Sequence, residues 1–185
     1  MNCKPIIVVA GEPYSIFLEI FFKTKKKCTF KKPIILIASK KLVYLQMKKL
    51  GFNFDLNLIN LDKLDLKSLK KNQINLIDVN FKFNKTFNKI SDKSNSYINK
   101  SFDIALKILK EENCSGLING PISKKYFLKG KSLGITEYLA KKTKNNNNVT
   151  MLIYNKKLSV SPITTHLPLK DVHKNISKKK IYTHI

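Results

Sequence analysis

The stretch SPITTHLPLKD, residues 161–171, holds His166, one of only three histidines in the chain. A neutral imidazole is a good ligand for zinc or cobalt, and the threonines and prolines around His166 can hold its backbone rigidly. A lone histidine in a loop, however, is more often a surface residue or a structural one. His166 by itself therefore leaves two interpretations open, a working site or a plain turn.

Three more corners with glycine or polar residues follow apolar or helical segments of the chain. They are Gly11-Glu12-Pro13, Gly120-Pro121 and the stretch from Gly134 to Glu137. In open α/β sheets, ligands bind beyond the carboxyl ends of the strands, which is where such corners lie. Each corner taken singly is an ordinary turn, so only their combination points to a site.

Hydrophobic patterning predicts the elements that position these corners. Continuous apolar runs at 4–10 and 32–39 are typical of buried parallel strands, and a clear amphipathic helix spans about 98–112. Ser39 is a candidate N-cap and Gly51 a candidate C′ residue of a further helix. The remaining predictions for the first part are a helix at 15–23, weaker strands at 55–60 and 74–79, another strand at 115–120, and an exposed connection at 81–96.

The last third of the chain predicts a helix at 134–143, two strands at 149–154 and 158–164, and a helix from about Pro168. Residues 145–148, all asparagine, indicate a loop tip. Ser177 is placed to cap a final helix with Ile181 and Ile185 on one face. Because so short a helix needs a packing partner, we expect the chain to be the front portion of a longer protein.

Strands separated by helices favour an α/β fold with a largely parallel sheet. We expect a first α/β lobe over residues 1–118 and the incomplete start of a second lobe over 119–185, which carries the corners at 134–137 and at His166. No apolar run approaches the roughly 20 residues that span a bilayer, so we expect a cytoplasmic protein with no membrane partner.

The formal net charge of +24 raises the possibility of a nucleic-acid partner. All 36 basic residues are lysines, scattered along the chain, and the arginines that usually read phosphates and guanine are absent. We therefore predict no nucleic-acid partner. The three cysteines, Cys3, Cys28 and Cys114, form no metal or disulfide pattern and are predicted to be small buried apolar residues.

Four strings in this order, VVAGEP, LINGPISKK, GITEYLAKKT and VTMLIYNKKLSVSPITTHLPLKDV, resemble the 4-hydroxythreonine-4-phosphate dehydrogenase family of pyridoxal phosphate biosynthesis. TTHLPL is the most specific of them. The resemblance runs from about residue 5 to the last residue. It implies the N-terminal portion of a three-layer α/β/α fold like that of isocitrate and isopropylmalate dehydrogenases.

The resemblance also implies an activity, the NAD- or NADP-linked oxidation and decarboxylation of 4-phosphooxy-L-threonine to 3-amino-2-oxopropyl phosphate. A divalent metal (zinc, cobalt or magnesium) takes part, and the full-length enzyme is a homodimer. By the same resemblance His166 is a metal ligand and Thr136 contacts the substrate. The other metal ligands and the cofactor-binding residues are expected beyond residue 185, no catalytic residue is assigned, and the isolated chain is expected to be inactive.

The sequence departs from the family at several positions. Ile135 stands where the family has a histidine that binds substrate, and Tyr14 to Leu18 replace a run with two glycines and a proline. His173 and His184 match no family ligand and are predicted to lie on the surface. Two alternatives stay open, a paralogue that acts on a threonate or erythronate phosphate, and a decayed homologue without catalysis.

Overall fold

The computed structural model describes residues 4–111, 114–145 and 149–184. The chain forms two compact units, Met1–Phe127 and Leu128–Ile185, which we call unit 1 and unit 2. The lobes predicted at 1–118 and 119–185 stay a prediction.

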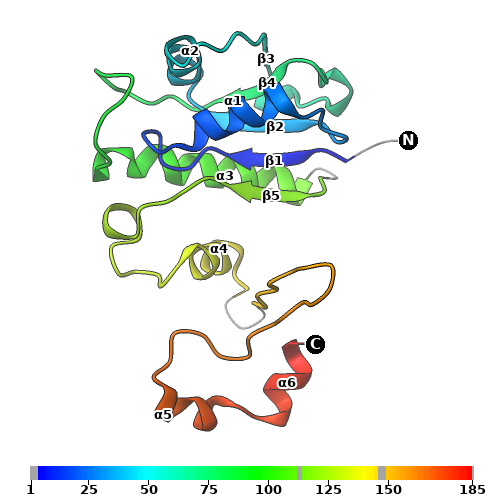
Figure 1. Ribbon diagram of the computed structural model, residues 1–185, viewed down its shortest axis with the longest axis vertical. Helices are drawn as coiled ribbons and strands as arrows, with labels where there is room; N and C mark the ends of the chain where they lie inside the picture. The colour runs from blue at the N-terminus through cyan, green and yellow to red at the C-terminus, as the bar shows by residue number, and fades with distance from the viewer. Residues whose placement is uncertain (1–3, 112–113, 146–148, 185) are drawn as a thin grey trace. The chain divides into compact units, whose positions relative to one another are not determined.

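Unit 1 is built on a five-stranded sheet in which every pair of neighbouring strands is parallel (Figure 1). The strand order is β3-β4-β2-β1-β5, so the first strand lies inside the sheet. In register, Val8 of β1 pairs with Leu36 of β2 and with Ile118 of β5. The strands are β1 (Ile6–Val9), β2 (Ile34–Ala38), β3 (Leu56–Leu58), β4 (Ile74–Asp78) and β5 (Gly116–Asn119), which confirms all five predicted strands of this unit.

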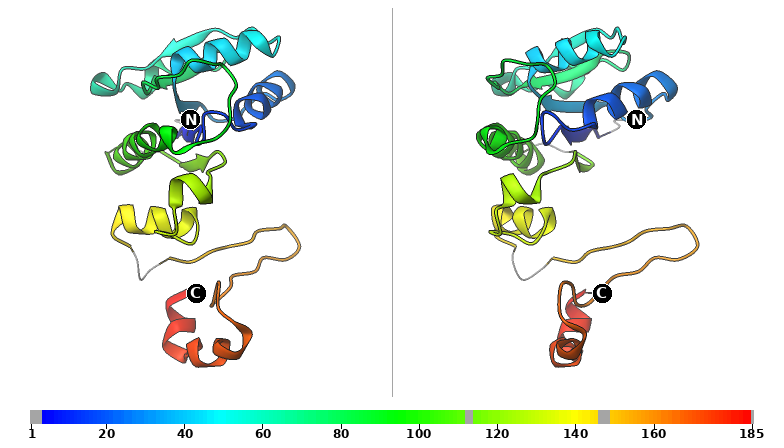
Figure 2. Two further views of the ribbon diagram at one scale, coloured as in Figure 1. Left: turned by 90° about the vertical axis from the view of Figure 1, so that its left-hand side faces the viewer. Right: turned by 60° about the vertical axis from the view of Figure 1, so that its left-hand side comes forward.

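Helices cover both faces of this sheet. Because side chains alternate along a strand, Val8 and Leu36 face α1 (Phe17–Lys27) and α2 (Lys40–Lys49), in one buried cluster with Phe22 of α1. The intervening residues of β1 and β2 are fully buried on the opposite face, where α3 (Asn95–Glu111) packs. Figure 2 shows α1 and α3 on opposite sides of the sheet. The three-layer α/β/α arrangement predicted from the sequence is confirmed.

Local signals set the ends of α2 as predicted. The Ser39 hydroxyl accepts a hydrogen bond from the Leu42 amide at 3.5 Å, which satisfies one of the free N–H groups at the start of the helix. At the other end Gly51 takes a φ of 71°, the left-handed conformation that glycine adopts most readily.

The prediction of an exposed connection at 81–96 is wrong in part. Its path is irregular, with only a short helical turn at Asp92–Ser94, but Phe81, Thr86 and Ser94 are buried. The Gln46 amide of α2 donates hydrogen bonds to the carbonyls of Thr86 (3.0 Å) and Pro13 (3.1 Å), which ties the connection to the sheet's carboxyl edge. Long-range contacts thus bury three residues of a connection that is otherwise largely exposed.

Two more predictions about unit 1 have clear outcomes. Cys28, the C-cap of α1, is exposed, and Cys114 is only partly buried, so the prediction of buried cysteines is wrong for both. Cys3 lies outside the described residues. None of the described helices is long and apolar enough to cross a membrane.

Unit 2 has little regular structure. A π-helical turn at Lys124–Leu128 leads into it, followed by α4 (Ile135–Thr143), which confirms the predicted helix. The strands predicted at 149–154 and 158–164 are reduced to one antiparallel bridge between Ile153 and Val160. Neither arm of this hairpin has a further strand beside it within the described residues, and its apolar side chains are exposed, so pairing does not propagate.

The C-terminal helices of unit 2 are short. The helix predicted from about Pro168 is α5 (Leu169–Val172), one turn long and followed by a helical turn at His173–Asn175. Ser177 accepts a hydrogen bond from the Lys180 amide at 3.2 Å and so caps α6 (Lys178–His184), as predicted. His173 is exposed, as expected.

Candidate functional site

Two of the four predicted corners meet at the carboxyl edge of the sheet. The Gly120 amide donates to the Val9 carbonyl at 2.7 Å, and the Glu12 amide donates to the Pro121 carbonyl at 2.9 Å. Gly11 has a φ of 71°, and a β-carbon on Gly120 would lie only 2.2 Å from the Ala10 carbonyl oxygen. The parallel pairing of β1 with β5 brings the two corners together, and glycine is required because the backbones touch.

A group of buried polar side chains lies beside these corners. The Glu12 carboxyl is 2% exposed, and its Oε1 lies 2.5 Å from the Ser94 hydroxyl. Burial raises the pKa of Glu12, although the Ser94 hydrogen bond opposes that shift. Tyr97, in the first turn of α3, accepts a hydrogen bond from the Ser39 amide at its phenol oxygen. Burial strongly raises the pKa of this phenol. These side chains form a polar group that is closed to solvent.

The other two corners meet in unit 2, where Thr136 and Thr165 line the same cavity, of about 320 Å³. On α4, the residues that face it are spaced one helical turn apart, with Thr136 and Glu137 one turn before Lys141. We call this space the α4 cavity. Its lining consists of Thr136, Glu137, Ala140, Lys141, Val149, Met151, Pro162, Ile163 and Thr165.

The hairpin of unit 2 holds the far wall of the α4 cavity. Ile153 and Val160 exchange backbone hydrogen bonds of 2.8 and 2.9 Å, and the Ser161 hydroxyl donates to the Met151 carbonyl at 2.9 Å. These bonds keep the segment that carries Met151 beside the segment that carries Thr165. Lys141 is itself anchored, since its ammonium donates to the Lys131 carbonyl.

His166 is the next residue after Thr165, and it is exposed to solvent. Its φ of 58° puts it in the left-handed region, which is uncommon for any residue with a side chain. Strained backbone of this kind concentrates at functional sites. From the sequence, His166 is predicted to lie at the end of a strand. The structure places it in the loop that follows the hairpin, because the second arm forms only the one bridge at Val160.

The described residues do not form a complete metal site. They contain no group of three histidine, cysteine, aspartate or glutamate side chains placed to hold an ion. His166 therefore offers one imidazole and lacks the companion ligands that a divalent metal needs. The fit to a metal is partial, and no chemical step can be derived through it from these residues.

Ile135 is the first residue of α4 and is partly buried. Its neighbour Thr136 lines the α4 cavity, whereas Ile135 is absent from the described lining. Sequence reasoning missed Lys141, although its spacing of four from Glu137 on a predicted helix was a usable signal. It also missed Ser94, which no local pattern connects to Glu12.

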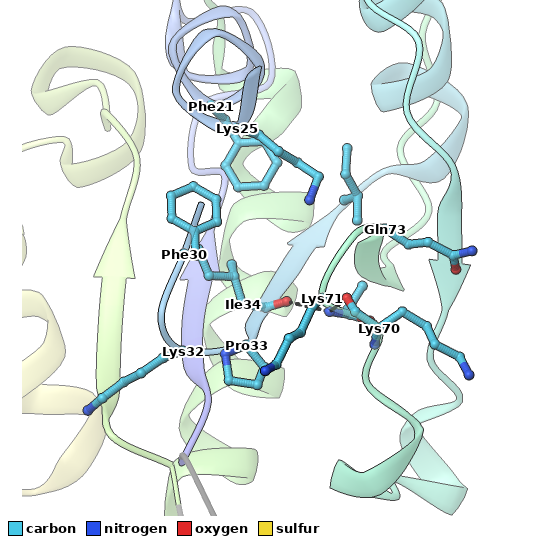
Figure 3. A pocket seen from close by; sticks show the side chains of 11 residues that line it. Phe21, Lys25, Phe30, Lys32, Pro33, Ile34, Lys70, Lys71 and Gln73 are labelled. Carbon is cyan, nitrogen blue, oxygen red and sulfur yellow. Dashed lines mark hydrogen bonds between the residues drawn. The ribbon is translucent and has the colours of Figure 1, made fainter. Parts of the chain in front are cut away.

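A second hollow lies at the amino ends of β2 and β4, shown in Figure 3. Its volume of about 20 Å³ is close to that of one water molecule, so a substrate cannot enter it. The buried Asn75 amide donates to the Ile34 carbonyl at 3.1 Å and accepts from the Lys70 backbone amide at 2.8 Å. These bonds hold the strand ends and the loop that line the hollow. Phe21, Lys25, Phe30, Lys32, Lys70 and Lys71 are among the residues that surround it.

A parallel sheet covered by helices on both faces, with polar corners at its carboxyl edge, defines the class, a three-layer α/β/α protein. The sequence pattern of the family "Pyridoxal phosphate biosynthetic protein PdxA" matches residues 29–185. The chain belongs to this family, and the resemblance noted from its motifs is confirmed.

Curated relatives carry the name 4-hydroxythreonine-4-phosphate dehydrogenase. The protein of Sulfurihydrogenibium sp. (strain YO3AOP1) is 30% identical over 183 residues, which are 97% of this chain and 55% of the relative. That of Wigglesworthia glossinidia brevipalpis is 25% identical over 182 residues, 95% of this chain and 54% of the relative. The chain thus spans about half the length of the curated relatives it matches.

Solved structures agree on the fold. A crystal structure of a 4-hydroxythreonine-4-phosphate dehydrogenase from Burkholderia phymatum has a TM-score of 0.81 at 18% identity, over 99% of this chain and 56% of that one. The enzyme of the same name from Klebsiella pneumoniae gives 0.80 at 21% identity, over 98% and 57%. At these identities the likeness establishes the fold alone.

Proposed function

We propose that this chain supplies the substrate-binding front portion of a 4-hydroxythreonine-4-phosphate dehydrogenase. The whole enzyme oxidises 4-phosphooxy-L-threonine with NAD or NADP, and loss of carbon dioxide gives 3-amino-2-oxopropyl phosphate for pyridoxine 5′-phosphate biosynthesis. The observation that carries the proposal is the α4 cavity, where the corners of Thr136 and Thr165 meet with His166 adjoining. The names of the curated relatives support the reaction class.

The donors around Thr136 suit an anionic group. The first backbone N–H groups of α4 have no partner within the helix, and a helix start favours negative charge. The Thr136 hydroxyl adds a donor, and the Lys141 ammonium adds a positive charge in the same lining. We assign to this group of donors the phosphate or the carboxylate of the substrate. Glu137, in the same turn, suits the substrate's ammonium group.

The proposed reaction transfers a hydride from the carbon that carries the substrate hydroxyl to the nicotinamide, and the hydroxyl proton leaves to a base. In this scheme His166 supplies one ligand of a divalent metal, zinc, cobalt or magnesium, that the full-length enzyme completes with ligands from elsewhere. In the same scheme, the full-length protein supplies the dinucleotide site and the homodimer interface. A cytoplasmic location suits this small-molecule substrate.

A second candidate follows from Ile135. An isoleucine beside Thr136 can donate no side-chain hydrogen bond, so a site built for a polar contact at this position would bind its substrate less well. A paralogue specific for a threonate or erythronate phosphate has the same anionic groups without the substrate's amine. A decayed homologue, the third possibility, would bind none of these compounds.

Titration calorimetry of the intact chain with 4-phosphooxy-L-threonine, threonate phosphate and erythronate phosphate tests the proposal. We expect 4-phosphooxy-L-threonine to bind best, and Thr136→Val to weaken its binding by about 1–2 kcal/mol, a factor of roughly 5 to 30. Thr143→Val, at the exposed end of α4, is the matched control and should leave binding unchanged. Preference for a phosphate without the amine would establish the paralogue. Absence of all binding, or equal effects of the two variants, would rule out substrate binding at Thr136.

A further inference from the structure

The Glu12 carboxyl sits where two segments of unit 1 meet, the turn after β1 and the start of α3. Its backbone is fixed on one side, since its amide donates to the Pro121 carbonyl and its carbonyl accepts from the Ser15 amide at 3.0 Å. Its side chain reaches Ser94, which lies 82 positions later in the sequence. The carboxyl group is therefore the direct link between these two distant segments.

The Ser94 hydroxyl has two oxygen neighbours within hydrogen-bond distance but only one hydrogen to donate. The Ser94 hydroxyl oxygen lies 2.5 Å from Glu12 Oε1 and 2.9 Å from the Ser91 carbonyl oxygen. A serine hydroxyl has one hydrogen, and a carbonyl oxygen can only accept. If Ser94 donates to Ser91, the short contact with Glu12 needs a hydrogen that only the carboxyl group can provide. A protonated Glu12 that donates to Ser94, which donates to Ser91, satisfies both contacts.

The charges that face Glu12 agree with a neutral group. No lysine or histidine forms an ion pair with it among the described residues, and its Oε2 is buried there without a hydrogen-bond partner. Tyr97 of α3 interacts electrostatically with Glu12, and its phenol, whose pKa burial raises, brings no positive charge. From α2, Gln46 bonds the neighbouring Pro13 carbonyl instead. An ionised carboxylate with one hydrogen bond and no cation is costly to bury.

We propose that Glu12 is a neutral carboxylic acid in the folded chain, over a pH range in which an exposed glutamate is ionised, and that its proton makes the link to α3 sensitive to pH. The raised pKa of Glu12 supports this, with desolvation as its main cause. As the carboxyl ionises, it loses the hydrogen that it gives to Ser94. The Ser94 hydroxyl can then donate to the carboxylate only by giving up the Ser91 carbonyl, and no cation balances the charge among the described residues. Unit 1 then loses stability at the edge that carries both glycine corners.

The direction of the pH effect follows from proton binding. A raised pKa means that the folded state holds the proton longer than the unfolded chain does. The contribution of Glu12 to stability is therefore fully present below its unfolded pKa, near 4.5, and is lost as pH rises through the folded pKa. Each pKa unit of difference lowers the folding equilibrium constant by about tenfold. An ion-paired glutamate would give the opposite trend.

Urea unfolding of the intact chain between pH 4.5 and pH 8, compared with Glu12→Gln, tests the proposal. Glutamine copies the shape of the neutral acid and its donor, so we expect the variant to lose the fall in the unfolding midpoint and to match or exceed the wild type at the high end. Glu19→Gln is the matched control because it breaks only the surface pair with Lys23 on α1, and it should keep the wild-type fall.

Carbon-13 NMR of the Glu12 carboxyl in the wild type gives a second readout that needs no variant. A titration midpoint above 4.5 supports the proposal, whereas a midpoint at or below 4.5 overturns it. A Glu12→Gln protein that is less stable than the wild type, with the same pH trend, would also overturn it. It would show that the carboxylate stabilises the fold as a charge.

Discussion

The contact between the two glycine corners of unit 1 leads to a quantitative prediction. A β-carbon added at Gly120 would lie 2.2 Å from the Ala10 carbonyl oxygen and 2.9 Å from Cδ2 of Phe17. The first of these is a main-chain atom of the residue directly after β1 and cannot rotate away. Overfilling a packed core costs about 1–3 kcal/mol, so we expect Gly120→Ala to cost about 3 kcal/mol, at the upper end of that range.

Two other glycines separate the causes. Gly51 has a φ of 71° with open space around it, so Gly51→Ala should cost only the left-handed penalty of about 1–2 kcal/mol. Gly11 combines the same φ with a β-carbon 2.6 Å from the Pro121 carbonyl oxygen. Gly11→Ala should therefore be the most damaging of the three, at about 4 kcal/mol or more.

Urea unfolding followed by circular dichroism measures the three free energies of unfolding. Because Gly11 and Gly120 belong to one contact, their double variant should cost less than the sum of the single variants. The reasoning is refuted if Gly120→Ala costs no more than Gly51→Ala. It is also refuted if the double variant is strictly additive, because the two corners would then be independent.

Two more predictions concern His166 and Asn75. His166→Gly relieves the left-handed strain that His166→Ala retains, so we expect the free energy of unfolding of the glycine variant to exceed that of the alanine variant by about 1 kcal/mol in urea unfolding. Both variants lack the imidazole, so its loss cancels in the comparison. Equal stabilities would show that φ at this position costs nothing. Asn75→Leu removes an amide whose oxygen and nitrogen each make two hydrogen bonds, and should cost about 2–4 kcal/mol in urea unfolding, because the Ile34 carbonyl and the Lys70 backbone lose their partner; a cost below 1 kcal/mol would contradict this.

The sheet of unit 1 could be predicted because its information is local. The runs that became β1 and β2 are apolar throughout, which suits strands covered on both faces, and Ser39 and Gly51 mark the ends of α2 by their own chemistry. The meeting of the Gly11 and Gly120 corners also follows from sequence, because parallel strands end at one edge. The sequence therefore predicts that Gly11 and Gly120 lie near each other, but it does not predict how closely their backbones approach.

Elements that depend on distant partners could not be predicted. The arms around Ile153 and Val160 have the composition of strands, but a strand needs a neighbour, and within the described residues their strand pairing is a single bridge between these two residues. Thr86 is buried where its carbonyl accepts a hydrogen bond from the side-chain amide of Gln46, 40 positions earlier in the sequence. The hydrogen bond between Glu12 and Ser94 joins residues that are even farther apart in the sequence, 82 positions, and no periodicity of the sequence predicts it.

The candidate site of unit 2 falls between these two cases. Thr136 and Thr165 are 29 positions apart, the difference between 165 and 136, and each was recognised from its own motif and not from a predicted contact. The structure joins them through α4 and the single hairpin bridge, so that one cavity contains both. Two motifs identified separately, and then found to line one cavity, support each other more strongly than either motif does alone. Ile135 lies beside Thr136 but outside the described lining of this cavity, so its replacement leaves the two motifs assembled.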